Sequence, residues 1–189
     1  IDITYNICIK FYLPYRIVFL STLTISLNKI EAIIFDFDGV LTNNLVYIDQ
    51  NGKESVSCSR ADGLAFDILH KLQKTSCIIS MEKNQVVTAR ANKLKIPALQ
   101  GVDNKAEAIN KFAEQEGFDL KNVLYVGNDL NDYRAMQLCG YTACPSDSHA
   151  IIKSMATIVL KTTGGNGVVR ELLEDIFQVN FIKILYSDK

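Results

Sequence analysis

Short apolar runs alternate with segments of helical periodicity from residue 30 to residue 177, and this alternation limits the fold more than any other feature of the sequence. The apolar runs have the length of buried parallel strands and lie at 30–36, 77–80, 97–100, 123–126, 141–144 and 158–160. The segments between them carry apolar residues at helical spacing and lie at 62–73, 86–94, 105–116, 132–139, 148–155 and 168–177. Such regular alternation predicts an α/β fold of three layers around a mostly parallel sheet.

One stretch interrupts the alternation. Residues 45–48 and 53–58 flank the sequence Asp-Gln-Asn-Gly, which is typical of a tight turn between antiparallel strands. On a single copy of the chain this hairpin would expose several apolar side chains, namely Leu45, Tyr47, Ile48 and Val56. An isolated two-stranded hairpin is marginally stable in water, so we expect its apolar surface to be covered.

Charge balance and cysteine content exclude several classes of protein. Twenty lysines and arginines oppose 21 aspartates and glutamates, whereas nucleic-acid-binding proteins normally carry a basic excess. The five cysteines form no C-x-x-C pair, which argues against a disulfide framework or a structural zinc site and favours a reducing cytoplasm. A length of 189 residues with 48% hydrophobic residues predicts one domain with a substantial core.

The first 29 residues differ in character from the rest. The apolar segment 17–27 has 11 residues, well short of the roughly 20 that a membrane-spanning helix needs. Lys10 and Arg16 precede it as in a signal peptide, but no small-x-small cleavage site follows. We therefore expect residues 1–29 to be an extension rather than a membrane anchor or export signal, followed by a domain at 30–178 and a tail at 179–189.

Polar side chains follow the expected strands at their carboxyl ends. Asp36 and Asp38 leave the first strand, Ser80 ends the second, Lys105 opens the helix after the third, and residues 127–132 form an acidic loop after the fourth. In parallel sheets these ends share one ligand-binding edge. Two neighbouring carboxylates favour a divalent cation, and Mg²⁺ takes one or two carboxylates together with phosphate and water oxygens. The pattern predicts a phosphoryl-transfer site in which one carboxylate attacks phosphorus.

These motifs resemble the haloacid dehalogenase superfamily of phosphatases. Residues 30–173 are most similar to its cap-less branch, which contains the 3-deoxy-D-manno-octulosonate 8-phosphate phosphatases and the phosphatase-like domain of N-acylneuraminate cytidylyltransferases. The stretches that carry the resemblance are 58–64, 100–105, 125–132 and 164–171. The resemblance implies a Rossmann-like fold with a hairpin insertion and no cap domain, and a Mg²⁺-dependent phosphatase of sugar-acid phosphates.

The resemblance also implies a role for each motif residue. Asp36 would be the nucleophile that becomes an aspartyl phosphate, and Asp38 would be the general acid and base. Ser80 and Lys105 would bind the phosphoryl group. Because Asp38 must be protonated when the leaving oxygen departs, we expect the neighbouring carboxylate to raise its pKa.

The metal ligands implied by the family are Asp36, Asp38 and Asn128, with Asp38 contributing its backbone carbonyl. Asp129 and Asp132 would be supporting acids. Asn128 stands where the family's phosphatases usually carry an aspartate, so this site has one negative charge fewer. An amide oxygen is still a hard ligand, and we expect Mg²⁺ to bind, but more weakly.

A second departure lies after Ser80, where octulosonate phosphatases carry a glycine and this chain carries Met81. Both departures look more like the cytidylyltransferase-linked subgroup. The expected substrate is therefore a sugar-acid phosphate. The two departures favour a nine-carbon, sialic-acid-type sugar over the eight-carbon octulosonate.

In cap-less relatives the hairpin builds a tetramer in which neighbouring subunits wall the active site. The same assembly would cover the apolar hairpin here, and we expect a homotetramer. A fused or partner cytidylyltransferase is a further expectation from the resemblance. Charged side chains that would contact the substrate are Arg60, Asp62, Glu82, Lys93 and Arg170.

Two other functions were weighed. One is a weakly catalytic or non-catalytic oligomerisation domain of a cytidylyltransferase, which would differ only in turnover; the complete set of Asp36, Asp38, Ser80 and Lys105 argues against it. The other is a signalling receiver domain, which also combines aspartate, a hydroxyl and lysine around Mg²⁺. A receiver domain places its acidic pair and its phosphorylated aspartate on separate strands, so we exclude it.

Overall fold

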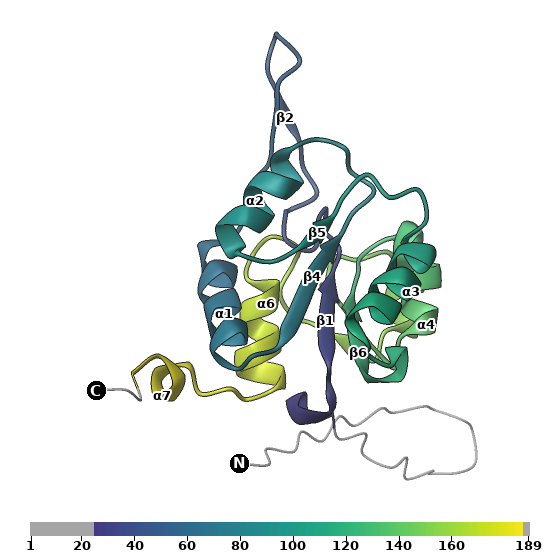
Figure 1. Cartoon of the computed structure of the whole chain (residues 1–189). Helices are drawn as coiled ribbons and strands as arrows, with labels where there is room; N and C mark the ends of the chain where they lie inside the picture. Colours follow the sequence, from purple (N-terminus) through teal and green to yellow (C-terminus); the bar gives the residue numbers. More distant parts are fainter. Residues whose placement is uncertain (1–24, 187–189) are drawn as a thin grey trace, which may run out of the picture.

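The computed structural model describes residues 25–186, and a six-stranded parallel sheet forms its middle layer (Figure 1). The strands, in chain order, are β1 (Ala32–Phe35), β4 (Thr75–Ile79), β5 (Ala98–Leu99), β6 (Val123–Val126), β7 (Tyr141–Cys144) and β8 (Ile158–Val159). They are arranged in the order β5-β4-β1-β6-β7-β8. The chain runs outwards from β1 to β5 and then returns to β6 on the other side of β1. This reversal opens a crevice beyond the carboxyl ends of β1, β4 and β6.

Helices cover both faces of the sheet, which confirms the predicted three-layer α/β fold. One core cluster joins the sheet to α1 (Arg60–Lys71), α2 (Val86–Leu94), α6 (Val168–Glu171), the π-helical η4 (Leu172–Ile176) and α7 (Phe181–Tyr186). The other joins it to α3 (Lys105–Glu116), α4 (Tyr133–Leu138) and α5 (Ala150–Met155). Short 3₁₀ turns complete the chain at η1 (Leu27–Lys29), η2 (Leu120–Asn122) and η3 (Leu130–Asp132).

Local signals explain why α3 begins at Lys105. The Asn104 side chain accepts hydrogen bonds from the backbone N–H groups of Ala106 and Glu107, which caps the helix. Gly117 ends the helix in the left-handed conformation, with φ of 76°. Both boundaries agree with those expected from the sequence.

The predicted hairpin is present and consists of the antiparallel strands β2 (Tyr47–Ile48) and β3 (Glu54–Ser55). It projects away from the body of the domain (Figure 1). The side chains of Leu45, Tyr47 and Ile48 are exposed, as expected for a single copy. The same expectation for Val56 is wrong, because this residue is half-buried against the core on the α1 side of the sheet.

Core packing extends beyond residues 30–178. Ile25, within the expected extension, and Phe181, within the expected tail, are both buried in the core cluster. The tail expectation overlooked α7, which is held in place because Phe181 packs inwards and Arg170 lies 4.5 Å from the centre of its ring. Residues 1–24, where the membrane-anchor and export-signal alternatives were weighed, lie outside the described residues. Within residues 25–186 no helix has the length and hydropathy to cross a membrane.

Candidate active site

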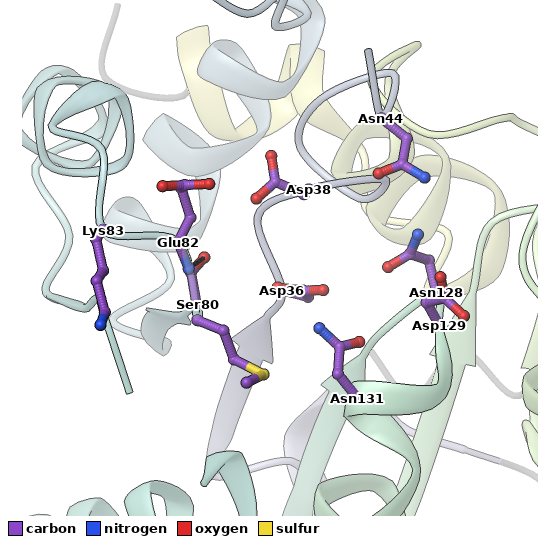
Figure 2. A pocket seen from close by; sticks show the side chains of 10 residues that line it. Asp36, Asp38, Asn44, Ser80, Glu82, Lys83, Asn128, Asp129 and Asn131 are labelled. Atoms are coloured by element: carbon purple, nitrogen blue, oxygen red, sulfur yellow. Dashed lines mark hydrogen bonds between the residues drawn. The ribbon is translucent and has the colours of Figure 1, made fainter. Parts of the chain in front are cut away.

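A cavity of about 420 Å³ lies at the carboxyl ends of β1, β4 and β6 (Figure 2). It brings together residues from three of the four segments singled out in the sequence, those that follow β1, β4 and β6. The lining residues are Asp36, Asp38, Asn44, Ser80, Met81, Glu82, Lys83, Asn128, Asp129 and Asn131. Lys105, in the first turn of α3, is not among these lining residues, but its ammonium contacts Asp36, which is.

Asp36 follows β1 directly and is fixed by its neighbours. Its Oδ1 accepts hydrogen bonds from the Lys105 ammonium and from the Phe37 backbone N–H, each at 2.7 Å. No donor among the described residues bonds to Oδ2. The carboxylate is thus held by one oxygen, which leaves the other for attack on a ligand in the cavity.

Lys105 joins two buried carboxylates. Its ammonium lies 2.7 Å from Oδ1 of Asp36 and 2.7 Å from Oδ1 of Asp132, and all three side chains are almost fully buried. Burial alone would lower the pKa of Lys105, but the two carboxylates outweigh it and the pKa is raised, so the lysine stays protonated. Burial, together with the charge of Asp132, raises the pKa of Asp36 well above its usual value.

Asp132 is occupied by protein donors on both oxygens. Oδ1 accepts from Lys105 and from the Tyr125 hydroxyl at 2.9 Å, and Oδ2 accepts from the backbone N–H groups of Asn128 at 2.8 Å and Asp129 at 3.3 Å. Its lone pairs are therefore used in holding Lys105 and the 128–129 loop. This geometry supports a positioning role for Asp132 rather than direct contact with a ligand.

Asp38 is half-buried and its pKa is raised, in the direction expected from the sequence. The cause differs from the expected one. Burial contributes most and the carboxylate of Glu82 comes next, whereas we had expected Asp36 to raise it. A raised pKa favours the protonated carboxyl that a general acid needs.

Ser80 is buried directly after β4, and its hydroxyl oxygen accepts a hydrogen bond from the Glu82 backbone N–H at 3.1 Å. The hydroxyl proton remains available to a ligand in the cavity. Together with the Lys105 ammonium, it gives the site a neutral and a charged donor.

The donors available to a metal are oxygens. No group of three or more His, Cys, Asp and Glu side chains within residues 25–186 is arranged to bind a metal ion. Asp36, Asp38, Asn128 and Asp129 nevertheless line one cavity. Carboxylate and amide oxygens, completed by substrate phosphate and water, suit Mg²⁺, so the donor set fits this ion.

Gly39 has a specific reason to be glycine. Its φ is 76°, and a Cβ atom there would lie 1.9 Å from Nδ2 of Asn128. The loop after β1 therefore packs directly against the Asn128 side chain, which fixes the amide beside the two aspartates.

Gly164 and Gly165 brace the loop after β1 from the opposite side. The Gly165 N–H donates to the Val40 carbonyl at 3.0 Å, and a Cβ on Gly164 would lie 2.2 Å from the Gly39 carbonyl oxygen. Two backbones can approach so closely only because these residues lack side chains. This contact could not be predicted from the sequence, since no local signal links residues more than 100 positions apart.

Of the five expected substrate contacts, only Glu82 lines the cavity. Asp62 instead accepts hydrogen bonds from the backbone N–H groups of Val169 and Arg170 at the start of α6, at 2.8 and 3.1 Å. Arg170 is paired with Glu174 and stacks on the α7 aromatic ring. Within a single chain, Asp62 and Arg170 are thus engaged by protein groups, and neither lines the cavity.

Two other expected contacts, Arg60 and Lys93, are exposed on α1 and α2 and do not line the cavity. Four residues of the site were not predicted from the sequence, namely Tyr125, Asn44, Lys83 and Asn131. A buried tyrosine always needs a partner for its hydroxyl, and Tyr125 could have been flagged on that ground. Asn44 and Lys83 lie in loops whose paths the sequence does not reveal, and Asn131 lies in the 3₁₀ turn η3.

Comparisons with known proteins show the family to which the chain belongs. The family model for haloacid dehalogenase-like hydrolases matches residues 70–172. The 3-deoxy-D-manno-octulosonate 8-phosphate phosphatase of Escherichia coli K12 is 33% identical over 148 residues, which cover 78% of this chain and 79% of that protein.

Solved structures give the same result. A Streptomyces avermitilis protein assigned to the HAD family of hydrolases superposes with a TM-score of 0.80 at 40% identity, over 82% of this chain and 90% of its own. The Moraxella catarrhalis 3-deoxy-D-manno-octulosonate 8-phosphate phosphatase, solved with magnesium, phosphate and its sugar acid, superposes with a TM-score of 0.79 at 27% identity, over 85% and 94%. The chain therefore belongs to the haloacid dehalogenase-like hydrolases, in the cap-less branch of the octulosonate phosphatases, and is a phosphoric monoester hydrolase.

Proposed function

We propose that the chain is a Mg²⁺-dependent phosphatase that hydrolyses the phosphate ester of a 2-keto-3-deoxy sugar acid through an aspartyl phosphate on Asp36. The observation that carries the proposal is the Asp36 carboxylate, of which protein donors among the described residues bind Oδ1 but not Oδ2. It lies in a cavity that also contains Asp38, Ser80 and Asn128. The Lys105 ammonium on Oδ1 adds the positive charge that a phosphoryl group requires.

In the first step, Oδ2 of Asp36 attacks phosphorus and the bond between phosphorus and the sugar oxygen breaks. Protonated Asp38 gives its proton to the departing oxygen, which leaves as the sugar hydroxyl. The Ser80 hydroxyl and the Lys105 ammonium stabilise the charge on the remaining phosphoryl oxygens.

In the second step, Asp38, now ionised, takes a proton from a water molecule that attacks the aspartyl phosphate. The bond between phosphorus and Asp36 breaks, inorganic phosphate leaves, and both carboxyl groups return to their starting states. Asp36, Asn128 and the carbonyl of Asp38 would hold Mg²⁺, which when bound would neutralise part of the phosphate charge. Asp132 and Asp129 hold the loop and the lysine during both steps.

For the substrate we propose an octulosonate-type sugar-acid phosphate. Relatives over most of the chain carry that activity in their names. They favour the eight-carbon sugar over the nine-carbon, sialic-acid-type sugar towards which the sequence analysis leaned. The residues Met81 and Asn128, on which that lean depended, both line the cavity, so the nine-carbon sugar belongs in the test.

The test is a phosphate-release assay of the purified protein with Mg²⁺ against eight- and nine-carbon sugar-acid phosphates. Preference for the eight-carbon substrate is the expected result. Turnover of neither, in a protein that hydrolyses a simple phosphate ester, would contradict the substrate assignment. No turnover of any phosphate ester would favour the oligomerisation-domain alternative.

We further propose that the protein acts as a homotetramer in the cytoplasm. Leu45, Val46, Tyr47 and Ile48 are 50–67% exposed on adjacent positions of the projecting hairpin. Pairing hairpins about a closed symmetry axis would bury these side chains and satisfy the strand edges.

A further inference from the structure

Lys83 is the one cation among the ten residues that line the cavity. The same lining contains four acids: Asp36, Asp38, Glu82 and Asp129. Lys105 supplies a second ammonium, but Asp36 and Asp132 each bind it at 2.7 Å and its side chain is only 1% exposed. A ligand that carries an anion in addition to its phosphate therefore meets one available side-chain cation in this cavity.

Lys83 has no competing partner among the described residues. Their ion pairs involve Lys105, Lys111 and Arg170, and Lys83 forms none. Its side chain is exposed, so its ammonium is accessible to a ligand. An exposed, unpaired lysine on a pocket wall is common, and the case for Lys83 depends on what surrounds it.

The backbone around Lys83 is braced. The Gln100 side-chain amide donates to the Lys83 carbonyl at 3.1 Å, and the Gly101 N–H donates to the Glu82 carbonyl at 2.9 Å. Asn84 donates its backbone N–H to Oε1 of Glu82 at 2.6 Å. These contacts fix the backbone from which the Lys83 side chain extends. Less conformational entropy is therefore lost when its ammonium binds an anion.

The charges follow an order across the cavity. In Figure 2, Lys83 lies on the side opposite Asn128, and Ser80 and Glu82 lie between Lys83 and Asp36. A carboxylate such as that of Glu82 accepts hydrogen bonds from hydroxyl groups and repels other anions. A ligand with its phosphate at Asp36 is thus expected to carry hydroxyl groups past Glu82 and an anion only at its far end.

We propose that Lys83 binds the carboxylate of the substrate and determines specificity for sugar acids over uncharged sugar phosphates. The proposal rests on the proposed function and adds the orientation of the substrate. A sugar acid with phosphate and carboxylate at opposite ends of a hydroxylated chain has the charge order that the cavity presents. A carboxylate next to the phosphate would instead meet Glu82.

The kinetic test compares Lys83→Met with the wild type and with Lys83→Arg. For 3-deoxy-D-manno-octulosonate 8-phosphate, loss of one charge-assisted hydrogen bond should raise KM about ten-fold with little change in kcat. For para-nitrophenyl phosphate, which has no carboxylate, the rise in KM should be much smaller than for the octulosonate phosphate. Lys83→Arg should keep the wild-type KM. The matched control is Lys121→Met, an exposed lysine just before β6 at the opposite end of the sheet. Equal effects on the two substrates, or none on either, would overturn the proposal.

A binding test separates this proposal from the proposed function. Isothermal titration calorimetry with the free octulosonate, which has a carboxylate but no phosphate, needs no turnover. The wild type should bind it about ten-fold more tightly than Lys83→Met, and the neutral sugar alcohol should not show this difference. Equal affinities of the wild type and Lys83→Met for the octulosonate would overturn the role of Lys83. Lysine-dependent binding without hydrolysis of the phosphate would support Lys83 and contradict only the proposed catalytic function.

Discussion

Replacing Lys105 with methionine should destabilise the protein as well as inactivate it. Methionine has a similar length, so the change removes the charge with little loss of volume. It leaves the carboxylates of Asp36 and Asp132 buried without the cation that now lies 2.7 Å from each. Removing one partner from a buried ion pair costs roughly 3–5 kcal/mol, which would be a large part of the stability of an ordinary domain.

The assay is urea unfolding followed by circular dichroism at pH 7 and at pH 4.5. Burial raises the pKa of Asp36 even with the lysine present, and loss of the lysine charge should raise it further. An acid of this kind destabilises the folded protein as pH rises above the unfolded value, so the deficit should be larger at pH 7 than at pH 4.5. Lys111→Met is the matched control, because Lys111 lies on the same helix with a 67% exposed side chain, and its unfolding midpoint should not change.

A second substitution makes the test specific to the buried cluster of Asp36, Lys105 and Asp132. Adding Asp132→Asn to Lys105→Met removes one of the two uncompensated charges and should recover a substantial part of the lost stability. Turnover should still be reduced on the order of 10²–10³-fold, because the phosphoryl group has lost a donor. A Lys105→Met protein within about 1 kcal/mol of the wild type at pH 7 would refute the reasoning.

Four further predictions follow from other parts of the structure. Asp36→Asn should abolish turnover, because an amide cannot form the phosphoenzyme, while Lys105 keeps its buried ion pair with Asp132; near-normal rates in a phosphate-release assay would mean that another group attacks. Asn128→Asp should lower the Mg²⁺ concentration for half-maximal rate, and an unchanged titration would show that residue 128 is not a ligand. Burial raises the pKa of Asp62 from 3.8 to about 6. Folding stability should therefore fall by on the order of 3 kcal/mol between about pH 4 and pH 6, and Asp62→Asn should flatten this fall in thermal melts. Leu45→Lys with Ile48→Lys should convert the proposed tetramer to monomers in light scattering, whereas a monomeric wild type would contradict the proposed assembly.

The strand-end residues could be predicted because a general property of parallel sheets places them together. Asp36, Ser80 and Asn128 each follow a separate strand, and no local signal relates them. Once the strands are recognised as parallel, their carboxyl ends share one edge and the residues that follow must be neighbours. The prediction depended on strand positions alone, which the apolar runs revealed.

Most of the expected substrate contacts do not line the cavity, for the opposite reason. Asp62 and Arg170 are charged residues near glycine-containing motifs, and from the sequence they look available for a ligand. Their partners are distant in sequence: Asp62 accepts from backbone groups 107 and 108 positions away, and Arg170 stacks on Phe181 in a helix that was not expected. A charged side chain is available to a substrate only if no protein group has claimed it, and that is a property of the packed structure.

The same rule separates the two lysines of the site. Lys105 was predicted as the phosphate-binding cation because it opens a helix after a strand, and the structure shows it buried between two carboxylates. Lys83 carries no motif and was overlooked, yet it lines the cavity without an ion pair among residues 25–186. A lysine held by two carboxylates is fixed and serves chemistry that does not vary with the substrate. An exposed, unpaired lysine such as Lys83 can use its charge to bind the substrate. Differences in specificity within this fold should therefore arise at such exposed cavity residues and not at the buried cluster of Asp36, Lys105 and Asp132.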